Sequence, residues 1–228
     1  MITTYYMPEF KRKLTGAERT VLMLPLNVVM VARISGSVDD TRLSDVLDSM
    51  RARHTLLGVR VFIDEDHRAW FLAEGVPDFR INLAQRLDED QWLTVVLDEV
   101  RTPFPFDTGP LIRFSLLHTA EASDLIICAH HAICDGMSLT YLVRDILQHL
   151  ADPQREVEIL PVPPAITEET VPSPPAANFV ASSVIGLINF WWARNNNSFD
   201  RMDLERLHGE FWRQNADARI MAWALSCE

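Results

Sequence analysis

One short run of the sequence combines residue types that can carry out proton transfer: His130-His131-Ala132-Ile133-Cys134-Asp135-Gly136. An imidazole titrates near neutral pH, so it can accept a proton from a hydroxyl or an amine and later release it to a leaving thiolate. The preceding residues 125–129 are almost continuously apolar, which predicts a strand buried on both faces. Because side chains alternate along a strand, we expect one histidine to face a cleft and the other to face the interior.

Each of these residues, taken alone, also has an ordinary structural explanation. Both histidines can be satisfied core or turn residues, Asp135 or Ser138 can cap a following helix, and Gly136 can supply unusual backbone dihedrals. A histidine and a carboxylate four residues apart can share a metal ion, but the nearby sequence indicates no third protein ligand, which disfavours metal binding. Cys134 lacks an adjacent cation that would activate its thiol, and Ser138 is better suited to capping than to nucleophilic attack, so no acyl-enzyme is indicated.

The complete run resembles the H-H-x-x-x-D-G signature of an acyltransferase superfamily. That superfamily includes chloramphenicol acetyltransferase, the condensation domains of nonribosomal peptide synthesis, and stand-alone acyltransferases of polyketide and lipid assembly. Two further segments resemble the family in the same order and at matching spacing: residues 53–60 (RHTLLGVR), which look like its helix-end segment of R-H-x-x-L-R type, and residues 106–113 (FDTGPLIR), which look like its approach to a strand. The resemblance covers residues 10–150.

The resemblance implies a general base and a binding wall within the motif. His131, the second histidine, is expected to be the general base, and His130 is expected to support the site. Gly136 would keep the wall beside the base free of a side chain, as an arriving pantetheine arm requires. No tightly bound cofactor is implied, since the acyl donor is a thioester co-substrate.

The resemblance also implies a structural ion pair. Asp135 is expected to hold the motif loop by pairing with an arginine, and its removal would leave a buried charge uncompensated. The second arginine of the family's helix-end segment falls on Gly58 in this sequence. Arg53 and Arg60 are therefore both candidates for the partner of Asp135.

The fold implied by the resemblance is α/β: an α+β two-layer sandwich in which helices cover a mixed β-sheet, as in a lobe of chloramphenicol acetyltransferase. Local patterns agree, since Thr15 and Glu18 have capping-box spacing for a helix that runs toward Leu24. The periodicity predicts further helices at residues 89–100 and 139–150, and one that carries Leu43, Val46, Leu47 and Met50 on one face. Strands are predicted at residues 27–34, 56–63, 67–73, 111–117 and 125–129, the second and third joined as a hairpin by the acidic residues 64–66.

Composition along the chain divides it into three segments. Residues 1–152 are expected to form an N-terminal acyltransferase lobe that carries the motif, and the proline-rich residues 153–178 to form an extended connector. Residues 179–228 are expected to hold connecting helices, one of them with Leu204, Leu207, Phe211 and Trp212, and a strand near residues 218–225 that opens an incomplete second lobe. Two-lobed members of the superfamily are much longer, so a C-terminal lobe is expected to be missing from this chain.

The charge balance and the hydropathy exclude several classes of partner. With 21 Lys and Arg against 32 Asp and Glu, the net charge of −11 repels a phosphate backbone, which disfavours nucleic-acid binding. No apolar run approaches the roughly 20 residues of a membrane-spanning helix, and residues 1–13 lack the layout of a secretory signal, so we expect a cytoplasmic protein with no membrane span. The 3 cysteines include no C-x-x-C pair, which disfavours a disulfide framework or a zinc site.

The function expected from these features is transfer of an acyl group from a thioester to a hydroxyl or amine acceptor, with His131 as the base. The donor is either acyl-CoA or the phosphopantetheinyl thioester of a carrier protein, and the expected partners are the missing C-terminal lobe, such a carrier protein, and a small alcohol or amine. Two alternatives stay open: a non-catalytic module that binds a partner or carrier protein, and a small self-assembling acetyltransferase with sites between subunits.

Overall fold

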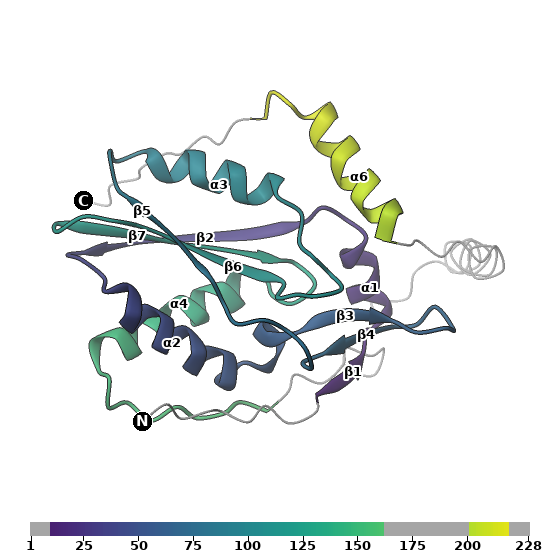
Figure 1. The fold of residues 1–228 in the computed structure, drawn as a ribbon, viewed down its shortest axis with the longest axis horizontal. Coiled ribbons are helices and arrows are strands. Elements are labelled where there is room, and N and C mark those ends of the chain that lie inside the picture. Colours follow the sequence, from purple (N-terminus) through teal and green to yellow (C-terminus); the bar gives the residue numbers. More distant parts are fainter. Residues whose placement is uncertain (1–9, 162–200, 219–228) are drawn as a thin grey trace, which may run out of the picture.

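The structure, a computed structural model, describes residues 10–161 and 201–218 and is built around a four-stranded sheet (Figure 1). The spatial order of the strands is β2-β7-β6-β5. Their bounds are β2 (Asn27–Ser35), β5 (Ile81–Gln85), β6 (Ile112–His118) and β7 (Ala122–His130). β7 runs antiparallel to β2 and β6, whereas β5 and β6 are parallel, so the sheet is mixed.

Strand β7 lies inside this sheet and is buried along nearly its whole length. The nearly continuous apolar run predicted a strand with two covered faces, and this prediction is confirmed. Its last residue, His130, pairs with Asn27 of β2, and Ala129 pairs with Ile112 of β6. The register therefore places the motif at the end of the most buried strand.

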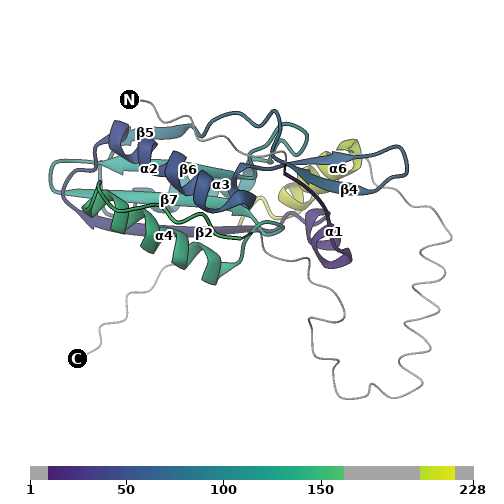
Figure 2. The same ribbon diagram turned by 90° about the horizontal axis from the view of Figure 1, so that it is seen from below.

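Helices cover both faces of the sheet, as Figures 1 and 2 show. α2 (Asp40–Arg53) and α4 (Gly136–Ala151) pack together on one face, and α3 (Gln91–Arg101) covers β7 and β2 on the other. The predicted apolar stripe of α2 is buried as expected: Leu43, Val46, Leu47 and Met50. The expected α/β fold with a mixed sheet under helices is confirmed, and α3 adds a third layer to the two that were expected.

A smaller sheet with the order β1-β4-β3 lies beside the main one. It contains β1 (Lys11–Lys13), β3 (Arg60–Ile63) and β4 (Ala69–Leu72), and the hairpin predicted at residues 64–66 joins the last two. The first hairpin strand begins at Arg60 rather than at residue 56, because Thr55–Gly58 forms a 3-10 helix. The capping box is confirmed: Thr15 and Glu18 close the start of α1 (Gly16–Leu22).

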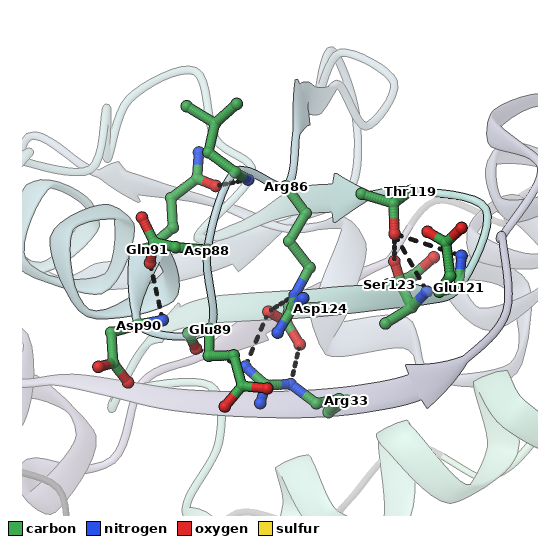
Figure 3. Close-up of polar contacts among 12 residues, drawn as sticks. Arg33, Arg86, Asp88, Glu89, Asp90, Gln91, Thr119, Glu121, Ser123 and Asp124 are labelled. Atoms are coloured by element: carbon green, nitrogen blue, oxygen red, sulfur yellow. Dashed lines mark hydrogen bonds and ion pairs between the residues drawn. The ribbon is translucent and has the colours of Figure 1, made fainter.

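A buried ion-pair network ties the outer parts of the main sheet to the first half of β7 (Figure 3). The carboxylate of Asp124 on β7 is 0% exposed. It accepts hydrogen bonds from Nε of Arg33 on β2 (2.7 Å) and from Nε of Arg86, which follows β5 (2.9 Å). Burial alone would raise the pKa of Asp124, but the hydrogen bonds from the two arginines outweigh burial and lower it. The buried carboxylate therefore stays ionised between its two partners.

The second described range contains α6 (Arg201–Gln214), which confirms the helix predicted from the spacing of apolar residues there. Arg101 of α3 donates to the carbonyl of Ala216 (3.0 Å), and its guanidinium lies 5.5 Å from the ring centroid of Trp212. The strand expected near residues 218–225 and most of the connector at residues 153–178 lie outside the described residues, so the division into segments stays a prediction. In the ranges that the structure describes, no helix is long and apolar enough to cross a membrane.

Candidate active site

The two motif histidines leave the end of β7 in different environments. The backbone N–H of His130 donates to the carbonyl of Leu111, and that of His131 donates to the carbonyl of Leu26, each at 2.9 Å. These bonds hold the motif between the start of β6 and the start of β2. The side chain of His130 is 2% exposed, whereas His131 is exposed to solvent. Strand alternation predicted this separation.

The imidazole of His131 is held by the loop that follows it. Its Nδ1 lies 2.8 Å from the carbonyl oxygen of Cys134. A carbonyl oxygen only accepts hydrogen bonds, so Nδ1 carries the proton in this contact. In the neutral ring of this exposed residue, Nε2 then keeps its lone pair as an acceptor. This arrangement is the one that a general base requires.

His130 has the opposite arrangement of donor and acceptor. Its Nδ1 accepts a hydrogen bond from the backbone N–H of Ala132 at 3.2 Å. The rings of Phe104 and Phe106 meet the imidazole edge-to-face, with centroids 6.1 and 5.2 Å away. Burial lowers the pKa of His130 to about 4, so the ring stays neutral near pH 7. His130 therefore supports the end of β7 as a neutral, packed side chain.

Asp135 is the N-cap residue of α4. Its Oδ1 accepts hydrogen bonds from the backbone N–H and the hydroxyl of Ser138, both at 2.7 Å. These bonds lower the pKa of Asp135. The expected ion pair with an arginine is absent among the described residues, and the alternative of a helix cap is the one the structure contains. An exposed aspartate satisfied by its own helix needs no buried cation.

The two candidate arginines lie elsewhere. Arg53 donates from Nε to Oδ2 of Asp145 at 2.9 Å, and the side chain of Asp145 is 5% exposed. Arg60 donates to the backbone carbonyl of Glu74 at 2.7 Å. The arginine that ends α2 therefore anchors α4 through Asp145, near its middle, rather than through the motif aspartate.

Asp145 is a polar residue that the sequence reasoning missed. It also accepts from the guanidinium of Arg144 (2.7 Å) and lies 3.3 Å from Nε2 of His54. Burial would raise the pKa of Asp145, but the hydrogen bonds from Arg144 and Arg53 lower it. A signal was present, since Asp145 interrupts the buried stripe of α4. A carboxylate on a core-facing stripe needs a partner. Arg53, in the helix-end segment, supplies that partner from 92 residues away.

Two motif positions have simpler surroundings. A Cβ placed on Gly136 would meet no heavy atom within 4 Å, so the space beside the start of α4 is open. Burial raises the pKa of Cys134 to about 12, which keeps its thiol protonated. Among the described residues, no group of three or more His, Cys, Asp or Glu is placed to hold a metal ion.

Comparison with known proteins identifies the family of this chain. A family model described as "Condensation domain" matches residues 26–164. This range includes the motif and the two further segments at residues 53–60 and 106–113. The chain belongs to the condensation-domain family. A linear gramicidin synthase protein of Brevibacillus parabrevis is 31% identical over 128 residues, which are 53% of this chain and 2% of that protein. Nonribosomal peptide synthetase 5 of Gibberella zeae is 26% identical over 144 residues, 62% of this chain and 1% of that protein.

Two solved structures share the fold of this chain at low sequence identity. The condensation domain from the monacolin K polyketide synthase MokA has a TM-score of 0.57 at 14% identity, covering 65% of this chain and 36% of that one. The epimerization domain from the third module of tyrocidine synthetase B has a TM-score of 0.56 at 17% identity, covering 71% of this chain and 38% of that one. The chain thus spans less than half of each of these solved structures and only a small part of the curated relatives.

Proposed function

We propose that this chain carries the base-bearing half of a condensation-type acyltransferase, which transfers an acyl group from a thioester to a hydroxyl or amine. The observation that carries the proposal is the contact between Nδ1 of His131, an exposed residue, and the carbonyl of Cys134, which leaves Nε2 as the acceptor of the neutral ring. Membership of the condensation-domain family supports the same reaction class.

The proposed reaction needs only one titrating side chain. As the acceptor oxygen or nitrogen attacks the thioester carbon, its proton moves to Nε2 of His131, and the ring becomes an imidazolium. The new C–O or C–N bond forms and the C–S bond breaks. The departing thiolate then takes the proton from Nε2, which returns the base to its starting form. The bond from Nδ1 to Cys134 keeps the ring oriented in both protonation states.

The co-substrates and partners belong to this proposal. The acyl donor is a CoA thioester or a phosphopantetheinyl thioester on a carrier protein, and the open space at Gly136 supports passage of a pantetheine arm beside the base. A C-terminal lobe, on this chain's own gene or on a second chain, would complete the channel, and a small alcohol or amine would be the acceptor. A cytoplasmic location is part of the same proposal.

A thiol-release assay tests the proposal directly. The full chain, with and without an added C-terminal condensation lobe, is incubated with acyl-CoA or acyl-carrier thioesters and a panel of small alcohols and amines, and free thiol is followed with time. We expect His131→Ala to slow release by about 100-fold or more, the typical contribution of a general base. His118→Ala is the matched control, because His118 ends β6 and pairs with Ser123, at the opposite end of β7 from the motif, and it should leave the rate unchanged.

Equal rates for the wild type and His131→Ala would contradict the catalytic proposal. If the wild type releases no thiol with any donor even when the C-terminal lobe is added, but binds the carrier protein, the non-catalytic module is the better description. Binding is measured separately by calorimetry with the loaded carrier protein, so the two outcomes are distinguishable.

A further inference from the structure

A cavity of about 190 Å³ lies beside the end of β7. Its walls come from residues 22–25 at the end of α1, Asn27, residues 103–106, His130 and two residues of α6, Glu205 and His208. His131 does not line it. The walls are mainly apolar, and an engineered apolar cavity of about 150 Å³ is large enough to bind benzene. The cavity therefore has room for one aromatic ring with a small substituent.

His130 contributes a hydrogen-bond donor, its Nε2–H, to the wall of this cavity. Because Nδ1 accepts from Ala132, the neutral ring carries its proton on Nε2. Nε2 is buried and has no hydrogen-bond partner among the described residues. The carbonyl of Leu24, on the cavity wall, is the nearest acceptor, and its hydrogen-bonding contact with the ring opposes part of the lowering of the pKa of His130, but that contact falls short of full hydrogen-bond geometry. A buried donor whose contact with its acceptor is poor is destabilising, so this N–H is poised for a better-placed acceptor.

The other polar groups of the wall narrow the class of ligand. The side-chain amide nitrogen of Asn27 already donates to the carbonyl of Val100 (3.1 Å). Glu205 lines the cavity and its carboxylate opposes an anionic ligand. His208 contributes a second buried Nε2, and its contact with the carbonyl of Val100 falls short of full hydrogen-bond geometry. A neutral ligand with a hydrogen-bond acceptor suits these walls better than an anion does.

We propose that this cavity binds a compact apolar or aromatic group that presents one carbonyl oxygen to the Nε2–H of His130. The rings of Phe104 and Phe106, which pack against His130, supply the apolar contact beside that donor. The proposal concerns binding alone and does not depend on acyl transfer by His131. A site built around one buried donor should reject a ligand that fits but lacks the acceptor.

Two small probes of matched shape test this proposal. Acetophenone and α-methylstyrene have the same number of heavy atoms and differ in one position, where C=O is replaced by C=CH₂. Dissociation constants for the full wild-type chain are measured by ligand-observed NMR. We expect acetophenone to bind about tenfold more tightly or better, since the hydrocarbon leaves the His130 donor unpaired.

Variants and contacts locate the effect. His130→Phe keeps an aromatic ring but removes the donor, so the two probes should bind equally, whereas His118→Phe should keep the preference. Intermolecular NOEs from the acetophenone methyl group to the rings of Phe104 and Phe106 are expected in the wild type, and they need no variant to fold. Equal binding of both probes to the wild type, a preference that survives in folded His130→Phe, or absence of these NOEs would each overturn the proposal. Thiol release is not measured, so failure here leaves the acyl-transfer proposal untouched.

Discussion

The two ends of β7 handle polar side chains in opposite ways. At the Asp124 end, one fully buried carboxylate has partners that are distant in the sequence. Arg33 is 91 residues from Asp124, and Arg86 is 38 residues from it. At the motif end, residues 130–136, the side chains of His131 and Asp135 are satisfied by groups only three residues away. Both motif side chains are also exposed.

This difference separates stability from reactivity within one strand. Long-range partners at the Asp124 end fix the positions of β2 and β5 against β7, so charge there contributes to the fold. Short-range partners at the motif end orient reactive groups without tying them to distant elements. The motif can therefore present Nε2 of His131 to solvent while the rest of the strand stays buried.

The largest expected effect comes from removing the charge at the Asp124 end. Asp124→Asn leaves two arginines, one of them well buried, without their carboxylate, and we expect the free energy of unfolding to fall by about 3 kcal/mol. Urea denaturation followed by circular dichroism measures this change. Glu121→Gln removes the same charge three residues away on the surface and should cost less than about 0.5 kcal/mol. A similar loss in both variants would contradict the assigned role of the network.

The second expected effect is the contribution of His130 to the pH dependence of stability. Burial lowers its pKa to about 4, whereas an unfolded histidine titrates near 6.5. The unfolded chain therefore binds more protons between these values, and stability present above pH 6.5 is lost as pH falls toward 4, by about 3 kcal/mol in total. His130→Asn cannot titrate, so its stability should change less over this window.

The slope with pH, rather than the absolute stability, is the quantity to compare. Burial also lowers the pKa values of His54 and His208, so the variant should keep part of the wild-type slope. The downward shifts of Asp124 and Asp145 act only below about pH 4, where ordinary carboxyl groups titrate. An unchanged slope in His130→Asn would show that His130 is not the buried neutral group described here.

The smallest of the three effects tests the cap at the motif end. Asp135→Ala removes the acceptor for Ser138 and should cost about 1 kcal/mol, the usual value for an N-cap. Asp135→Asn keeps a cap acceptor without the charge, so most of the stability should return. Chemical denaturation of both variants decides between the cap and the expected ion pair. If Asn is as damaging as Ala, the charge of Asp135 matters and an arginine partner is again required.

Features that depend on neighbours in the sequence could be predicted from it. The capping box at Thr15, the buried stripe of α2 and the apolar run of β7 each contain their own signal, because the period of side-chain burial is set by local geometry. The separation of the two motif histidines follows from the same alternation. Those predictions are confirmed.

Features that depend on distant segments could not be predicted in the same way. β1 is three residues long and charged, and β5 is defined by its parallel pairing with β6, so neither has a clear local period. The partner of Arg53 is Asp145, 92 residues away, and the resemblance directed attention to Asp135 instead. A family signature names which residues belong to a site, but it does not fix which of them meet.

The tautomer of His131 is the most direct test of the central claim, which is that this histidine offers Nε2 as a base. The chain has 7 histidines, so the ¹⁵N resonances of His131 are assigned by their loss in His131→Gln. Long-range ¹H–¹⁵N spectra of the labelled wild type are recorded at pH 8.5, about two units above the ordinary pKa of imidazole. We predict a protonated Nδ1 and an unprotonated Nε2, as the contact with Cys134 requires. A protonated Nε2, or equal populations of the two tautomers, would contradict the account.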